Sequence, residues 1–236
     1  MKYIKDKNCT VVYYSQIGSN HIKAGKENQD TVFFERLDKN RWYIAIADGV
    51  SSAAKSKQGS QAAVEVAHEI CLMLKNEEWN LEDIKVDIVR KWKSKFSKDW
   101  NDYATTLNLL VYVDGKLLVG QIGDGLMVTN VDGEDEIYTE ESDFYSTETD
   151  ALAEAVRRKA ITLTQKHISK KFYAYLMSDG IGKEVAIEER INLGKYLFGL
   201  MESSEADIKS EIIPWINNLE NKNGDDKTIG IIRWEE

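Results

Sequence analysis

Short segments rich in β-branched and aromatic residues recur along the chain, and several are joined by connections too short to hold a helix. Asp114-Gly115, for example, is a two-residue hairpin turn between segments 105–113 and 116–121. Strands joined in this way run antiparallel. The segments are 10–15, 31–37, 41–47, 105–113, 116–121, 126–130, 160–164, 172–177 and 228–234. We expect antiparallel sheets, with 126–130 as a third strand after the hairpin.

Apolar residues three or four positions apart predict helices over 56–75 and 81–100. Two further helical patterns follow 172–177, and the sole proline, Pro214, either starts or bends the second. Residues 134–150 are acidic and contain few apolar residues, so we expect a surface connection there. Strands and helices in this order indicate an α+β fold.

Length and composition fit one domain spanning residues 1–236, with 42% apolar and 30% charged residues. The net charge of −9 and the lack of a basic block exclude nucleic-acid binding. No apolar run approaches the ~18 residues of a membrane span, and the N-terminus lacks a signal-peptide pattern. Cys9 and Cys71 make neither a disulfide framework nor a zinc pattern. We therefore expect a cytoplasmic protein without membrane contact.

Aspartates stand at five strand edges. Asp48, Asp124 and Asp179 each follow an apolar strand and precede a glycine, Asp225 comes before the last strand, and Asp30 comes before the strand at 31. Any one Asp-Gly pair is explained by turn chemistry, as for Asp114-Gly115 and Asp132-Gly133. Turn chemistry does not explain the whole set as well, because antiparallel strands can bring several of their ends, and therefore several of these aspartates, to one edge of the fold.

Clustered carboxylates repel one another unless cations lie between them. An aspartate-rich set with few histidines suits Mg²⁺ or Mn²⁺, and no stretch has the spacing of a calcium-binding EF-hand. Two such ions a few ångströms apart can share a carboxylate and activate a water molecule for attack on phosphorus. The residues therefore predict a two-ion centre for phosphate chemistry.

The order of motifs resembles the metal-dependent Ser/Thr protein phosphatases of the 2C family. The motifs are NQD, ADGVSS with a following GSQAA, YATTLNLLV, GQIGDG, LMSDG and GDDKTIGII, and GSNHIKAGKENQD is most similar to a bacterial branch. The resemblance implies a four-layer αββα sandwich, in which two antiparallel sheets pack face to face between helices. It also implies phosphorylated protein substrates and a cognate Ser/Thr kinase that phosphorylates them.

Carried over residue by residue, the resemblance implies that Asp48 bridges two ions and that the Gly49 carbonyl joins it. Asp179 and Asp225 would complete the first ion's ligands, and Asp124 would lie at a third, weaker position. The fourth residue after Asp179 is often acidic in the family and helps the third ion. Here it is Lys183, with Glu184 next to it, so the resemblance implies two ions and leaves a third open.

A second set of residues lies before the strand at 31. Asp30 would hold metal-bound water, and Gln29 stands where many members have a glutamate, so its amide oxygen is the candidate ligand. Many members place a phosphate-binding arginine where this chain has Gly25. Lys26 or His21 could contact the phosphate instead, although His21 also reads as an ordinary loop residue.

The resemblance implies hydrolysis of phosphoserine or phosphothreonine by direct attack of a metal-bridging hydroxide. Val50 stands where some members have a histidine, which excludes a general acid from that position. Two alternatives remain open: a weak or inactive binding module with this fold, and a metal-dependent hydrolase of small phosphate esters.

Overall fold

The computed structural model describes residues 1–139, 151–154, 160–219 and 224–235. Its strands form a six-stranded sheet in the order β1-β2-β11-β10-β7-β8 and a five-stranded sheet in the order β3-β4-β5-β6-β9, both antiparallel. The strands are β1 (Lys2–Asp6), β2 (Cys9–Gln16), β3 (Thr31–Asp38), β4 (Arg41–Ala47), β5 (Leu107–Val113), β6 (Lys116–Ile122), β7 (Leu126–Val131), β8 (Glu134–Tyr138), β9 (Thr162–His167), β10 (Lys171–Met177) and β11 (Lys227–Glu235).

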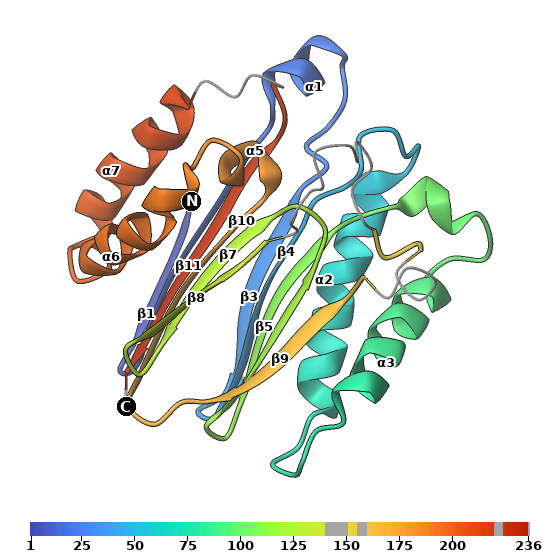
Figure 1. Cartoon of the computed structure of the whole chain (residues 1–236). Helices are drawn as coiled ribbons and strands as arrows, with labels where there is room; N and C mark the ends of the chain where they lie inside the picture. The colour runs from blue at the N-terminus through green and yellow to red at the C-terminus, as the bar shows by residue number, and fades with distance from the viewer. Residues whose placement is uncertain (140–150, 155–159, 220–223, 236) are drawn as a thin grey trace.

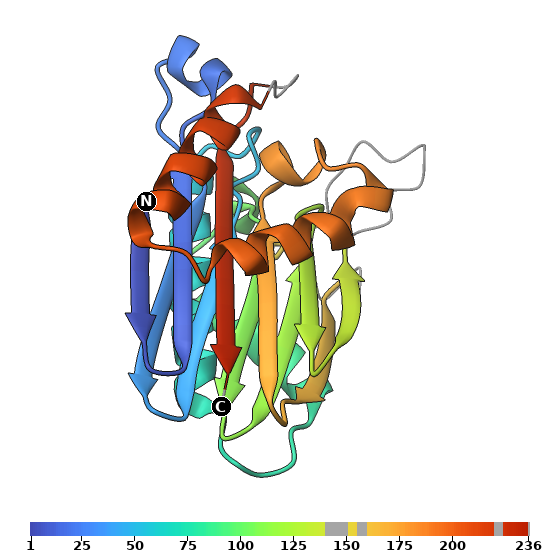
Figure 2. The ribbon, with the colours of Figure 1, turned by 90° about the vertical axis from the view of Figure 1, so that its left-hand side faces the viewer.

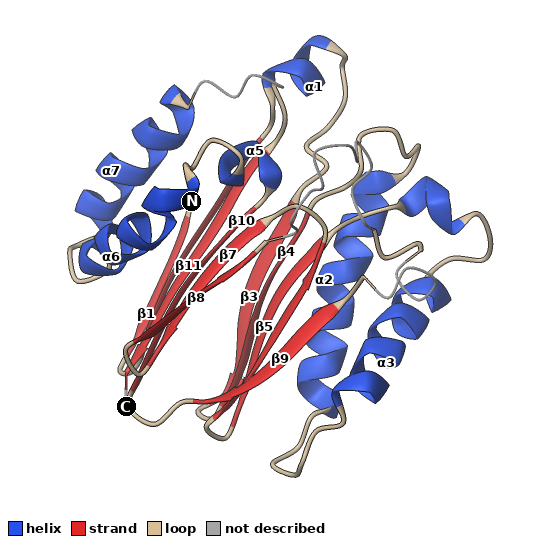
Figure 3. Cartoon of the chain, viewed as in Figure 1, coloured by secondary structure: helices blue, strands red, loops and turns tan. Residues whose placement is uncertain are grey.

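The two sheets face each other between two layers of helices (Figures 1 and 3). Helices α2 (Ser56–Met73) and α3 (Leu81–Ser94) cover the five-stranded sheet, and α6 (Arg190–Leu200) and α7 (Glu205–Asn218) cover the six-stranded sheet (Figure 2). The short helices α1 (Ser19–Lys23) and α5 (Asp179–Gly182) lie at one end of the sandwich. The four-layer sandwich expected from the sequence is confirmed.

Alternating side chains of β4 show how the layers are held together. Because successive residues of a strand point to opposite faces, one set enters the core between the sheets and the other packs under α2. The inter-sheet set is Trp42, Ile44 and Ile46, and the helix-facing set is Tyr43, Ala45 and Ala47. Trp42 stacks on Tyr112 of β5 and on Phe172 of β10, so its ring joins the two sheets.

The expected third strand of the hairpin, β7, belongs to the other sheet. It pairs with β10 and β8, whereas β6 pairs with β9. The chain crosses between the sheets at 123–125, where Gly123 has a φ of 93° and Gly125 packs against the Met177 carbonyl. The turn chemistry at this point is the same as in a hairpin, so the sequence did not distinguish the two.

Other differences are local. The helix expected to reach residue 100 ends at Ser94, because Phe96 turns back to stack on Tyr103 and Asp99 adopts a positive φ of 57°. The expected surface connection is partly wrong, since Glu134–Tyr138 forms β8, while 140–150 lies outside the described residues. Pro214 lies inside α7 rather than at its start. Within the described residues, no helix is long and apolar enough to cross a membrane.

Candidate metal centre

The strand ends bring the predicted aspartates to one end of the sandwich. Thr31 of β3 pairs with Ala47 of β4, so Asp30 and Asp48 are neighbours across the five-stranded sheet. In the other sheet, Met177 of β10 pairs with both Ile229 of β11 and Leu126 of β7. These registers place Asp179 beside the segments that carry Asp225 and Asp124. The centre therefore takes residues from both sheets.

Asp48 lies in the middle of this group. Its carboxyl contacts those of Asp30 and Asp179. Burial raises the pKa of Asp48 well above its usual value, and the nearby charges of Asp30, Asp179 and Asp225 raise it further. Without cations, these carboxyl groups must bind protons or repel one another.

Asp30 is almost completely buried, at 3% exposure. Burial raises the pKa of Asp30 to about 7, while hydrogen bonds from Thr228 and Ser178 favour its charged form. The Ser178 hydroxyl donates to Asp30 Oδ2 at 2.8 Å and accepts from the Thr228 backbone N–H at 3.0 Å. Ser178 thus connects Asp30 of one sheet to the start of β11 in the other. No sequence pattern marks this serine as functional, and the only signal for it is its position directly before Asp179.

Two threonines directly before β5 hold the backbone of Asp48. The Asp48 N–H donates to Thr106 Oγ1 at 3.0 Å, and its carbonyl accepts from the Thr106 N–H at 2.9 Å and from Thr105 Oγ1 at 2.8 Å. Gly49 is buried against Ser56, whose backbone carbonyl would lie 2.8 Å from an added Cβ. A glycine is needed here because the start of α2 packs on it, a reason that the sequence did not reveal.

Among the described residues, several buried side-chain oxygens have no hydrogen-bond partner. Those on the predicted site residues are Asp179 Oδ1, Asp30 Oδ1 and Gln29 Oε1, and Gln29 is 8% exposed. Buried polar atoms without partners are uncommon in folded proteins. Hard-oxygen ligands of this kind, on clustered carboxylates, fit Mg²⁺ or Mn²⁺. The residues present therefore suit the ions that the sequence predicts.

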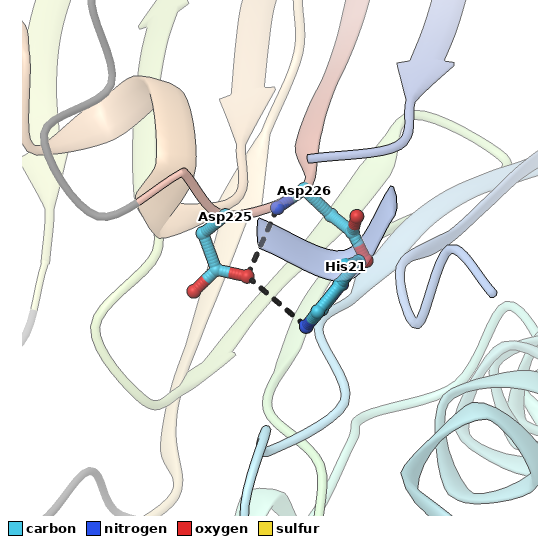
Figure 4. A group of neighbouring side chains, drawn as sticks. All are labelled: His21, Asp225 and Asp226. Carbon is cyan, nitrogen blue, oxygen red and sulfur yellow. Dashed lines mark hydrogen bonds and ion pairs between the residues drawn. The ribbon is translucent and has the colours of Figure 1, made fainter. Parts of the chain in front are cut away.

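His21 belongs to the same end of the molecule but is paired with aspartates (Figure 4). Its Nδ1 lies 2.9 Å from Asp226 Oδ2, although not in line for a hydrogen bond, and its Nε2 lies 3.9 Å from Asp225 Oδ1. His21, Asp225 and Asp226 could supply atoms to a metal ion. However, both Asp226 oxygens accept backbone N–H groups at 2.6 Å, Oδ1 from Gly18 and Oδ2 from Gln29. We interpret Asp226 as an organiser of the loop rather than as a ligand.

Replacing Asp226 by alanine is expected to lower the free energy of unfolding by roughly 2–4 kcal/mol, because two buried N–H groups lose their acceptor. Asp226→Asn keeps one acceptor oxygen and should lose less. Denaturant unfolding in EDTA measures both. Equal stability of the alanine variant and the unchanged protein would contradict this role.

The two candidate lysines lie at different places. Lys26 is exposed, and its Nζ donates to the Ser51 carbonyl at 3.1 Å, next to the loop that follows Asp48. Lys183 Nζ donates to Asp124 Oδ2 at 2.6 Å and to Asp179 Oδ2 at 2.7 Å. Partial burial lowers the pKa of Lys183, but the hydrogen bonds to Asp124 and Asp179 outweigh it and raise that pKa overall.

The model of the protein phosphatase 2C family matches residues 17–223. The match covers most of the chain, and the chain belongs to this family. No curated protein sequence matches it significantly.

Solved structures show the same fold at low sequence identity. RsbX in complex with magnesium is 14% identical, with 99% of each chain covered and a TM-score of 0.66. The catalytic domain of the serine/threonine phosphatase PstP with two manganese ions is 18% identical, covering 97% of this chain and 99% of that one, with a TM-score of 0.66. Stp1 from Staphylococcus aureus is 13% identical, covering 96% and 95%, with a TM-score of 0.63.

Proposed function

We propose that this protein is a Mn²⁺- or Mg²⁺-dependent phosphatase that removes phosphate from serine or threonine of phosphorylated proteins. The observation that carries the proposal is the contact of the Asp48 carboxyl with those of Asp30 and Asp179 across two sheets. A cluster of this kind is costly in a metal-free protein. Membership of the protein phosphatase 2C family supports the same reaction.

In this proposal Asp48, the Gly49 carbonyl, Asp179 and Asp225 hold two ions, with Gln29 as a further ligand. When bound, the ions supply an activated water molecule and positive charge for the phosphate group. Asp30 orients water through the carboxyl that Ser178 fixes.

We assign contact with the substrate phosphate to Lys26 rather than to His21. Lys26 is exposed beside the Ser51 carbonyl, whereas His21 is 6% exposed and paired with Asp226. In this assignment His21 helps to position the Asp225 carboxylate, because its Nε2 lies 3.9 Å from Asp225 Oδ1. A cognate kinase and a cytoplasmic location stay predictions.

The first alternative is an inactive module with the same fold. Gln29 brings no charge to the centre and Gly25 offers no side chain to a phosphate, which favours this alternative. The intact group of Asp48, Asp179 and Asp225 favours the enzyme. The second alternative, a hydrolase of small phosphate esters, differs only in substrate.

Hydrolysis of an aryl phosphate tests the activity directly. We expect turnover that requires Mn²⁺ and that is lost in Asp179→Asn, because this change removes a negative charge from the ligand set. Absence of turnover from a folded protein that binds Mn²⁺ would favour the inactive module. Comparing a phosphoserine peptide with small phosphate esters then separates the two enzymes: a higher kcat/KM for the peptide supports the proposal, and a higher value for the small esters contradicts it.

A further inference from the structure

Lys183 lies between two carboxylates of the candidate centre. It follows the short helix α5, four residues after Asp179, and this spacing brings its side chain back to the Asp179 carboxylate. Asp124 reaches the same point from the connection between β6 and β7. One ammonium group therefore joins the two strand ends that carry Asp124 and Asp179.

The contacts are short and use one oxygen of each carboxylate. Nζ lies 2.6 Å from Asp124 Oδ2 and 2.7 Å from Asp179 Oδ2, and the Asp124 and Asp179 side chains are only 18% and 14% exposed. The second oxygen of Asp179, Oδ1, is buried without a hydrogen-bond partner. Asp179 thus binds Lys183 through one oxygen and keeps the other for an ion shared with Asp48.

A divalent ion held between Asp124 and Asp179 would compete with the Lys183 ammonium group for the Oδ2 atoms that face this point. Mg²⁺ binds carboxylate oxygens at about 2.0–2.1 Å, closer than the ammonium nitrogen does. Two cations at this point would repel each other strongly at such a distance. Lys183 and a metal ion are therefore alternative occupants.

We propose that the Lys183 ammonium group is a fixed internal cation between Asp124 and Asp179, so that the centre holds two divalent ions and excludes a third. This inference rests on the two-ion centre of the proposed function. It replaces the sequence expectation that Asp124 is a metal ligand.

The charges of the centre agree with this proposal. Apart from Asp226, whose two oxygens accept backbone N–H groups, five carboxylates gather there, from Asp30, Asp48, Asp124, Asp179 and Asp225. Two divalent ions together with one ammonium group carry as many positive charges as these five carboxylates carry negative ones.

The test is the number of Mn²⁺ ions bound per chain, measured by equilibrium dialysis with metal analysis and by titration calorimetry. We expect two ions in the unchanged protein, three in Lys183→Ala, where both Oδ2 atoms lose their contact with the ammonium group, and two in Lys183→Arg, which keeps a cation. Lys209→Ala is the matched control, because Lys209 makes a similar ion pair with Glu205 four residues away on α7. It should bind two ions.

Thermal unfolding gives a second readout that needs no activity. In EDTA, Lys183→Ala should unfold at a lower temperature than the unchanged protein, since Asp124 and Asp179 lose their shared cation. Added Mn²⁺ should raise the unfolding temperature of Lys183→Ala by more than it raises that of the unchanged protein. Three ions in the unchanged protein, or two in Lys183→Ala, would overturn the proposal for Lys183 and leave the phosphatase intact. Failure of the unchanged protein to bind Mn²⁺ at all would overturn both.

Discussion

Asp48→Asn is expected to lower kcat/KM for phosphatase activity on the order of 10²–10³-fold, because it removes the carboxylate that lies between the two halves of the centre. The same change should stabilise the metal-free protein. Asp48 contacts Asp30 and Asp179, so a neutral amide relieves repulsion in the buried group. Turnover with Mn²⁺ and thermal unfolding in EDTA measure the two effects.

The stabilisation should depend on pH in a defined direction. The pKa values of Asp48 and Asp30 are raised in the folded state, to about 7 for Asp30, so protonation favours folding. The metal-free protein should therefore lose stability as the pH rises from about 4, the value for an unfolded aspartate, through about 7. The Asp48→Asn variant should lose less stability than the unchanged protein over that pH range. Asp114→Asn is the control, since Asp114 lies in the hairpin turn between β5 and β6, at the other end of β4 from Asp48. Equal pH dependence in all three proteins would contradict the interpretation of the cluster.

Gly59→Ala is expected to destabilise the protein by roughly 3 kcal/mol or more, at the upper end of the effects of overpacking. Gly59 lies in α2, and a Cβ built on it would lie 1.8 Å from the Tyr103 carbonyl oxygen. That oxygen belongs to the backbone, so α2 itself would have to move. The Gly59 carbonyl also accepts a hydrogen bond from Trp92 of α3, at 3.0 Å, which the movement would strain. Denaturant unfolding measures the loss.

Gly199→Ala, also in a helix, is expected to have the opposite effect on stability. Gly199 lies in α6, and nothing stands within 4 Å of a Cβ built there. Alanine should therefore stabilise the protein by about 0.5–1 kcal/mol, as it does where a helical glycine has room. A similar change in the free energy of unfolding for Gly59→Ala and Gly199→Ala would show that the contact with Tyr103 does not exclude a side chain at residue 59.

The strands that carry the site could be predicted because their residues have a simple pattern. Residues 42–47 form an uninterrupted apolar run directly before Asp48, and residues 172–177 form another that only Ser178 separates from Asp179; the structure has strands at both places. The glycine-containing turn at Asp114-Gly115 was also recognisable, and both residues have positive φ. In this turn, the neighbours in the chain are also the neighbours in space, because β5 pairs with β6.

The features that could not be predicted depend on contacts between residues that are distant in the sequence. The assignment of β7 to the second sheet follows from its pairing with β10, some fifty residues later, and no local pattern encodes it. Asp226 directly follows Asp225 in the sequence, but the hydrogen bonds that it accepts from Gly18 and Gln29 join segments about 200 residues apart and depend on the fold. Lys183 was noticed as a basic residue where an acid was expected, yet its bridge to Asp124 required the fold.

The ring of Trp42, stacked between Tyr112 and Phe172, sets the spacing of the two sheets far from the carboxylates. Asp48 extends from one of those sheets and Asp179 from the other, so the gap available to the proposed ions depends on the thickness of the apolar layer between the sheets. Ion binding and inter-sheet packing are then thermodynamically linked, and each must alter the other by the same free energy. A substitution of Trp42 would in this way change the affinity for metal ions, although Trp42 lies far from the candidate metal centre.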